Sequence, residues 1–338
     1  MKYNWLNKQR IWLLSMITFG RTRQRYKNKL SLFPKDTKYV QSVYNEFKNS
    51  VHDFIKEDKF NFFLPAGIGD TLLALAYMQA FKDKYKTDIF LFVRPEHETL
   101  LKMCGFSEKN YYMSDFFKGR DILFPLPQVN SAPFPQKGEI FFLHPKCNAE
   151  TSKYQSEDFN SLYTNFLRLP KGLKPSFHII KQPNISSDAE KLLEALPGYD
   201  KCVFISQGAV SSLPMDNGFW EYLSSALIKK GYFIINNSIN PKEDSILKHD
   251  SHVSNIALSL SDAIAVAYRC RYAVSLRSGL CDALAAKGTN LHIIYPDEHF
   301  HRYFSVNKMY EENLSVREYI REGKNTFKIA DAILEKIC

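Results

Sequence analysis

The chain has 338 residues, of which 45% are hydrophobic and 14% aromatic, and it carries a formal net charge of +9 at pH 7. This length suits about two domains, and the basic balance favours anionic partners such as nucleotide phosphates, acidic lipids or nucleic acid. The six cysteines form no C-x-x-C pair, and no run approaches the ~20 apolar residues that span a membrane. These features argue against a disulfide scaffold, a cysteine zinc site and a membrane-spanning protein, and they are typical of a reduced, cytoplasmic protein.

Residues 1–30 combine basic side chains with aromatic and aliphatic ones and contain no acid. The apolar run at 11–19 is followed by an Arg-Thr-Arg triplet instead of a small-residue cleavage site, which argues against a signal peptide. A basic, Trp-bearing amphipathic helix on an anionic membrane surface fits this pattern. A helix packed on the body of the protein and a nucleic-acid contact are the alternatives. With a second helical pattern at 38–55, we predict a basic, aromatic helical extension at 1–57.

The first half of the chain is organised around a strand, a tight turn and a helix. The apolar run 60–64 is followed by Gly67, Gly69 and Asp70, and then by a long helical pattern. The glycines let a ligand approach the backbone closely, and Asp70 falls in the first turn of the helix at the carboxyl end of a strand. The dinucleotide fingerprint G-x-G-x-x-G is absent, because Leu72 stands where its third glycine should be. An acid that merely stabilises the helix end is the alternative to a functional Asp70.

Strands and helices alternate over residues 58–172, which predicts a first α/β domain with a parallel sheet. The predicted strands are 60–64, 88–93, 111–113, 121–124 and 139–143, and the predicted helices are 70–85, 96–104 and 154–169. His144 and Lys146 follow the last strand, where they could contact a phosphate or an acceptor hydroxyl. A proline-rich loop at 125–135 could shape an acceptor pocket. The alternatives are that His144 and Lys146 are ordinary loop residues and that the proline-rich loop is a rigid connector.

The second half repeats the alternation, so we predict a second parallel-sheet domain at 173–315. Its predicted strands are 202–206, 232–236, 252–255, 272–276 and 291–295, and its predicted helices are 187–196, 218–230, 261–269 and 279–287. The tail at 316–338 is predicted to be helical, with helices at 316–322 and 326–337. After the first strand of this domain, a turn with Gly208, Ser211 and Ser212 offers amides and hydroxyls to a phosphate.

A second strand, small-residue turn and helix follows at 272–286. Ser278 and Gly279 open the helix, so its free amides form a potential anion site. Arg277 is a candidate bidentate phosphate donor at the same place, and a salt bridge is the alternative. Asp282 could contact the donor sugar, or it could be an acid that stabilises the first turn of the helix, and the sequence favours neither interpretation.

These residues together resemble a known family. The elements Gly69-Asp70-x-Leu, Gly-Ala-x-Ser in the middle turn and Ser278-Gly279-x-x-x-x-Leu-Ala, within 60–295, resemble the two-domain GT-B glycosyltransferases, and most of all their heptosyltransferase-like (GT9) group. The resemblance implies two Rossmann-like domains facing across a cleft, with Asp70 as catalytic base and Ser278 and Gly279 holding the donor diphosphate. It also implies that the final helix crosses back to the first domain.

The chain departs from the family pattern at three points. Arg277 stands where the family has Asp, Asp282 where it has His, and Ser211 and Ser212 near the place of a Lys that helps neutralise the diphosphate. We infer that Arg277 replaces that cation. The departures do not support a heptose donor.

The expected function is an inverting glycosyl transfer, without metal or cofactor, from a nucleotide-sugar to a surface-glycan or glycolipid hydroxyl. No Asp-x-Asp motif is present. We expect a bacterial enzyme that is cytoplasmic and peripheral at the inner face of the cell membrane, with an anionic membrane surface as partner through residues 1–30 and no nucleic acid. A nucleotide-sugar epimerase of similar fold is the alternative, and a non-catalytic basic binding module is the third.

Overall fold

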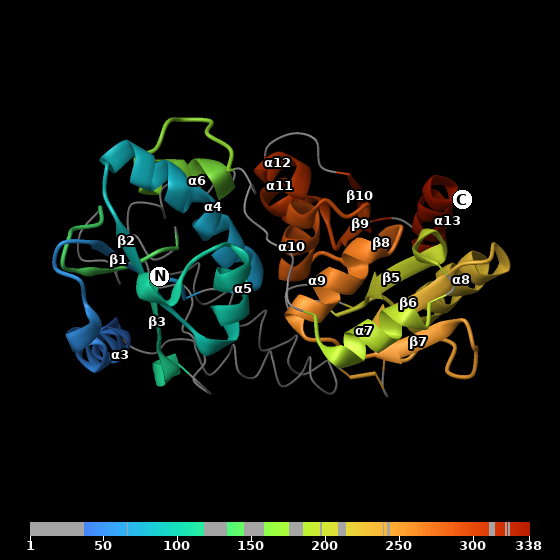
Figure 1. Ribbon diagram of the computed structural model, residues 1–338. Coiled ribbons are helices and arrows are strands. Elements are labelled where there is room, and N and C mark those ends of the chain that lie inside the picture. The colour runs from blue at the N-terminus through green and yellow to red at the C-terminus, as the bar shows by residue number, and fades with distance from the viewer. Residues whose placement is uncertain are drawn as a thin grey trace.

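The computed structural model contains two α/β units arranged side by side (Figure 1). It describes residues 37–338 except for 66, 118–133, 145–158, 176–184, 197, 209–213, 239, 242–243, 311–314, 322 and 324. The basic segment 1–30, the expected strand 121–124 and most of the proline-rich loop therefore lie outside the described residues.

The first unit is built on a parallel sheet of short, apolar strands in the order β3-β2-β1-β4. Its elements are α3 (Thr37–Ser50), β1 (Phe60–Phe63), α4 (Ile68–Tyr85), β2 (Ile89–Val93), α5 (Glu98–Met103), β3 (Tyr111–Met113), β4 (Ile140–Phe142) and α6 (Phe159–Phe166). Phe62 faces a core that includes Leu73 and Phe81 of α4, whereas Phe63 packs with Phe47 of α3 on the opposite face. Burial on both faces explains why these strands are continuous apolar runs instead of alternating ones.

The second unit is built on a six-stranded parallel sheet in the order β10-β9-β8-β5-β6-β7. Its elements are α7 (Ser187–Glu194), β5 (Cys202–Ser206), α8 (Asn217–Lys229), β6 (Phe233–Asn237), β7 (Val253–Ile256), α9 (Leu260–Arg269), β8 (Tyr272–Leu276), α10 (Gly279–Lys287), β9 (Leu291–Tyr295), α11 (Glu298–Phe304), α12 (Val306–Met309), β10 (Val316–Ile320) and α13 (Thr326–Ile337). The prediction of two parallel-sheet α/β units is confirmed.

Each sheet has a point at which the strand order reverses. In the first sheet the chain runs outward through β2 and β3 and then returns to place β4 on the other side of β1. In the second sheet β8 lies next to β5 after the chain has passed through β6 and β7. Ligands of open α/β sheets bind beside the carboxyl ends of strands at such a point. The described candidate site residues all follow β1, β4, β5 or β8.

The C-terminal tail differs from the prediction in two ways. Residues 316–320 form strand β10, paired in parallel with β9, and not a helix. Helix α13 packs its Ile329, Ile333 and Ile337 against α8 of the second unit, so it does not cross back to the first. The side chain of Tyr232 in the same unit donates a hydrogen bond to the Ile337 carbonyl at 3.0 Å. The tail therefore completes the second unit.

The two units meet through α4 and α10, which lie next to each other in the middle of the molecule (Figure 1). One apolar cluster continues from Leu72 and Leu73 of α4 to Ala283 and Leu284 of α10. A second contact joins α6 to α12, where the Asn160 amide donates to the Met309 carbonyl at 2.7 Å.

Candidate active site at two facing helix ends

Asp70 lies where the sequence predicts it, in the first turn of α4. Strand β1 ends at Phe63, and the chain turns through Pro65 and the exposed Gly67, which is the N-cap of α4. Gly67 has no side chain that could cap the first-turn amides of the helix. Asp70 is half-buried and brings a carboxylate to the positive end of the helix.

Ser278 and Gly279 open α10 in the same way. Ser278 is the N-cap, with φ −148° and ψ 172°, and its side chain makes no capping hydrogen bond. Gly279 is the first residue of the helix, so its amide has no acceptor within the helix. The helical placement of Asp70, Ser278 and Gly279 is thus confirmed, whereas their roles stay predictions.

The two helix starts are in direct contact through glycines. A Cβ added to Gly279 would lie 2.5 Å from the backbone nitrogen of Gly69 and 3.0 Å from the Cβ of Ile68. A Cβ added to Gly69 would lie 2.5 Å from the Asp282 Oδ2 atom and 3.0 Å from the Gly279 Cα. No side chain larger than hydrogen fits at either position without movement. The two glycines, 210 positions apart in the chain, therefore bring the candidate base and the candidate diphosphate turn together.

Arg277 forms the salt bridge that was the alternative to a phosphate contact. Its Nη1 and Nη2 atoms donate to the two carboxylate oxygens of Asp282 at 2.7 and 2.9 Å, and its Nε donates to the Phe304 carbonyl at 2.9 Å. Nη1 also donates to the Ser278 carbonyl at 2.5 Å. Arg277 is 5% exposed and Asp282 0%, so in this arrangement neither presents its charge to a ligand.

Tyr310 closes this cluster from the end of α12. Its hydroxyl donates to Asp282 Oδ1 at 3.1 Å. Burial raises the pKa of Tyr310 well above its usual value, and the negative charges of Asp282 and Asp70 act in the same direction. The phenol is therefore protonated and serves as a donor.

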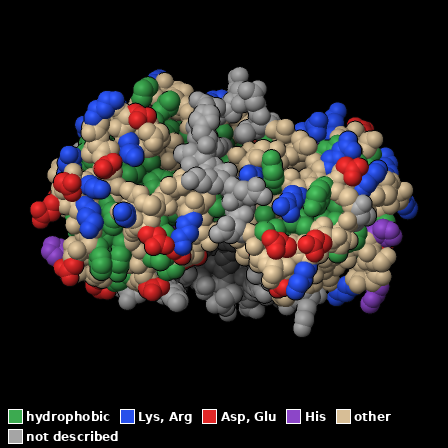
Figure 2. Space-filling model, in the orientation of Figure 1, with side chains coloured by type: hydrophobic (Ala, Val, Ile, Leu, Met, Phe, Trp, Pro, Cys, Tyr) green, Lys and Arg blue, Asp and Glu red, His purple; other side chains and the backbone are tan. Residues whose placement is uncertain are grey.

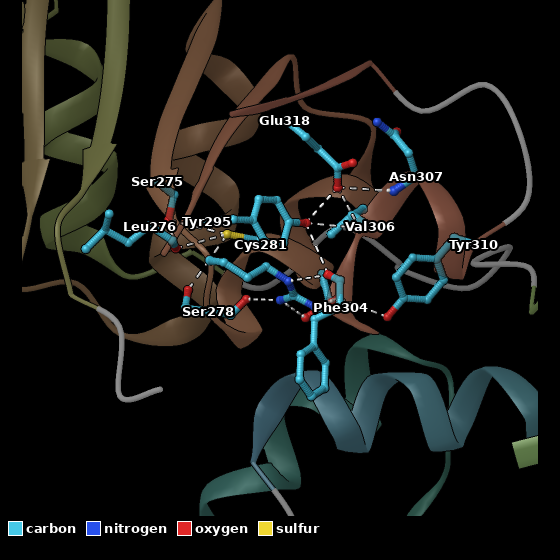
Figure 3. A network of polar contacts seen from close by, with 12 residues as sticks. Ser275, Leu276, Ser278, Cys281, Tyr295, Phe304, Val306, Asn307, Tyr310 and Glu318 are labelled. Atoms are coloured by element: carbon cyan, nitrogen blue, oxygen red, sulfur yellow. Dashed lines mark hydrogen bonds and ion pairs between the residues drawn. The ribbon is translucent and has the colours of Figure 1, made fainter. Parts of the chain in front are cut away.

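Glu318 on β10 anchors the segment that carries Phe304 and Tyr310. Its carboxylate accepts hydrogen bonds from the Tyr295 hydroxyl at 2.6 Å and the Val306 amide at 2.7 Å (Figure 3). It also accepts one from the Ser305 hydroxyl at 2.7 Å. Burial would raise the pKa of Glu318, but the hydrogen bonds from Tyr295, Ser305 and His301 outweigh it and lower that pKa below its usual value. Glu318 is therefore a charged structural anchor behind the helix ends.

The remaining candidates are spread along the same strand ends. Gly208 is exposed directly after β5, and His144 is 4% exposed directly after β4. Ser211, Ser212 and Lys146 lie outside the described residues. The structure therefore brings together Gly69, Asp70, Arg277, Ser278, Gly279 and Asp282, and it leaves Gly208 and His144 at neighbouring strand ends.

Sequence analysis missed Tyr310 and Glu318. Tyr310 is one of 19 tyrosines and belongs to no motif. Glu318 carried a weak signal, because the run Val-Arg-Glu-Tyr-Ile at 316–320 contains two β-branched residues and a tyrosine, which are residue types enriched in strands. Among the residues that the structure describes, no three His, Cys, Asp or Glu side chains gather closely enough to hold a metal ion.

Comparison with known proteins gives no match to any family model or curated protein. Solved structures do match. The ADP-heptose LPS heptosyltransferase II of E. coli has a TM-score of 0.54 at 12% identity, covering 82% of this chain and 98% of that chain. A glycosyl transferase of family 9 from Veillonella parvula has a TM-score of 0.54 at 11% identity, covering 83% and 92%. E. coli heptosyltransferase WaaC with ADP has a TM-score of 0.52 at 13% identity, covering 83% and 100%.

At these identities the likeness is one of fold. The chain has the GT-B architecture of the heptosyltransferases, and the predicted resemblance is confirmed at that level.

Proposed function

We propose that this protein is an inverting glycosyltransferase that moves a sugar from a nucleotide-sugar donor to an acceptor hydroxyl, with Asp70 as general base. The observation that carries the proposal is the contact between the first turns of α4 and α10 at Gly69 and Gly279. It joins a half-buried carboxylate on one unit to a helix N-terminus on the other, within a fold shared with heptosyltransferases.

The chemistry follows from these two groups. Asp70 takes the proton from the acceptor hydroxyl, whose oxygen attacks the anomeric carbon from the side opposite the leaving nucleoside diphosphate. The amides at Ser278 and Gly279 stabilise the negative charge that develops on the diphosphate, because they are fixed in place before the reaction begins. The mechanism requires no metal. Arg277 takes the role of holding Asp282 and not of binding phosphate, because its guanidinium is committed to the buried pair.

The acceptor is proposed to be a surface glycan or glycolipid at an anionic membrane. Eight of the nine surplus positive charges come from residues 1–30, which also hold two of the three tryptophans. The described surface, by contrast, mixes acidic and basic side chains on the face seen in Figure 2. This concentration of charge and aromatic rings at one end of the chain supports a membrane-surface contact there. None of the described helices is long and apolar enough to cross a membrane.

A nucleotide screen is the first test. Melting is measured with UDP, GDP, ADP, CMP and TDP in turn, since a nucleotide at ~100 times its dissociation constant adds about 2.7 kcal/mol to the stability of the protein that binds it. One clear hit supports a nucleotide-sugar donor and identifies its base. Failure of every nucleotide to stabilise the protein would count against the proposal.

The second test is Asp70→Asn, assayed for transfer with the donor class that the screen identifies. Loss of a general base typically lowers the rate by about 10²–10⁴-fold, whereas nucleotide-induced stabilisation should be retained. Asp188→Asn is the matched control, because Asp188 is also a first-turn acid but sits exposed on α7. Near-normal turnover of Asp70→Asn would mean that Asp70 only stabilises the start of the helix and is not the general base.

A further inference from the structure

The glycine contact between α4 and α10 is tighter than ordinary domain packing. The backbone nitrogen of Gly69 occupies the place of a Gly279 side chain, and the Asp282 carboxylate and the Gly279 Cα occupy the place of a Gly69 side chain. A backbone atom cannot rotate away as a side chain can. The separation of the two helix starts is therefore at its steric minimum.

The Asp282 carboxylate in this contact is equally fixed. Both of its oxygens accept from Arg277, and Oδ1 also accepts from the Tyr310 hydroxyl. Arg277 is held in turn by the carbonyls of Phe304 and Ser278. Asp282 thus acts as a rigid spacer between the first turns of the two helices, and it cannot yield to a methyl group on Gly69.

We propose that Gly69, Gly279 and the Asp282 carboxylate are positioning residues that set the distance between Asp70 and the N-terminal turn of α10. The catalytic part of this inference rests on the proposed function. Asp70 is the residue after Gly69, and Ser278 is the residue before Gly279, so any separation of the glycines moves the base away from the diphosphate turn. A displacement of about 1 Å between reacting groups can cost about 10²-fold in rate.

Hydrogen exchange tests the contact without any need for activity. The first amides of a helix have no intrahelical acceptor, so those of α4 depend on the surroundings for protection. Gly279→Ala, made in the second unit, should accelerate exchange severalfold in the peptide that covers 68–72 of the first unit. Gly218→Ala is the matched control: it adds the same methyl to the first turn of α8 in the same unit, where its Cβ meets only the Asp216 Oδ1 atom at 3.1 Å.

The reciprocal variant, Gly69→Ala, keeps the inference testable if Gly279→Ala does not fold. Gly69→Ala in the first unit should accelerate exchange at 279–283 of the second unit, and a melting curve reports whether each variant is folded. Unchanged exchange across the interface in a folded Gly69→Ala or Gly279→Ala protein would overturn the inference.

Kinetics then test the positioning role. Gly69→Ala should lower kcat about 10²-fold, because the added methyl group moves Asp70 away from the diphosphate turn. Gly218→Ala should keep the wild-type kcat. Normal turnover in a Gly69→Ala protein with a loosened contact would refute positioning. If the wild-type protein transfers no sugar, the proposed function fails, and the exchange measurement still decides whether the glycines set the spacing.

Discussion

Replacing Arg277 by Met distinguishes an ion-pair arginine from a phosphate-binding one. The variant keeps most of the aliphatic stem and removes the guanidinium from a site that is 5% exposed. The Ser278 carbonyl that Arg277 leaves behind still accepts from the Cys281 amide at 3.1 Å. The Phe304 carbonyl loses its Nε donor, because the single proton of the neighbouring Tyr295 hydroxyl is donated to Glu318 at 2.6 Å.

The larger part of the cost of Arg277→Met falls on Asp282, because leaving a buried charged group without its partner costs more than leaving a carbonyl without one. This carboxylate would lose both hydrogen bonds from the guanidinium and keep the one from the Tyr310 hydroxyl at 3.1 Å, in a position with 0% exposure. Removing one partner of a buried ion pair typically costs about 3–5 kcal/mol, because the remaining charge is desolvated and uncompensated. We expect Arg277→Met to lose stability in this range, measured as the shift of the urea-unfolding curve without nucleotide.

The double variant Arg277→Met/Asp282→Asn is the control for this reasoning. Asparagine removes the stranded charge and keeps an oxygen that accepts from Tyr310, so most of the lost stability should return. A loss below about 1 kcal/mol in Arg277→Met, together with the disappearance of nucleotide-induced stabilisation, would refute the ion-pair role and restore Arg277 as a phosphate ligand.

Two further predictions concern pH and the anchor behind the site. Burial lowers the pKa of both His97 and His292 from 6.5 to about 4. Between these two pH values the folded protein therefore binds fewer protons than the unfolded chain, and the free energy of unfolding should fall as the pH drops below 6.5. The expected loss at pH 5 is about 2 kcal/mol per histidine. Urea unfolding of His97→Gln/His292→Gln should show a flatter profile between pH 6.5 and 4, and a profile as steep as that of the wild type would contradict this. Glu318→Gln should lower the free energy of unfolding by about 2–3 kcal/mol, because the new amide group faces hydroxyl and backbone donors. The control Glu335→Gln, on the exposed side of α13, should change little. Equal unfolding midpoints for the two variants would contradict the anchoring role of Glu318.

The sequence determined the local elements of this fold. Strands such as Cys202–Ser206 and Leu291–Tyr295 were predicted at their observed bounds, because buried parallel strands are short apolar runs. The starts of α4 and α10 were also predicted, since small residues and first-turn acids mark helix N-termini within a few positions of the chain. These signals need no knowledge of distant residues.

The tertiary structure alone decided what these elements do to one another. Arg277 and Asp282 looked like two separate departures from a family pattern, but they are the two ends of one buried ion pair. Residues 316–320 form a strand because they pair with β9 at an edge of the second sheet, and the local sequence does not show that this edge is available. The contact of Gly69 with Gly279 depends on how two domains pack across 210 positions of chain. Local periodicity and capping carry no information about such a contact, because its geometry is set by packing between residues far apart in sequence.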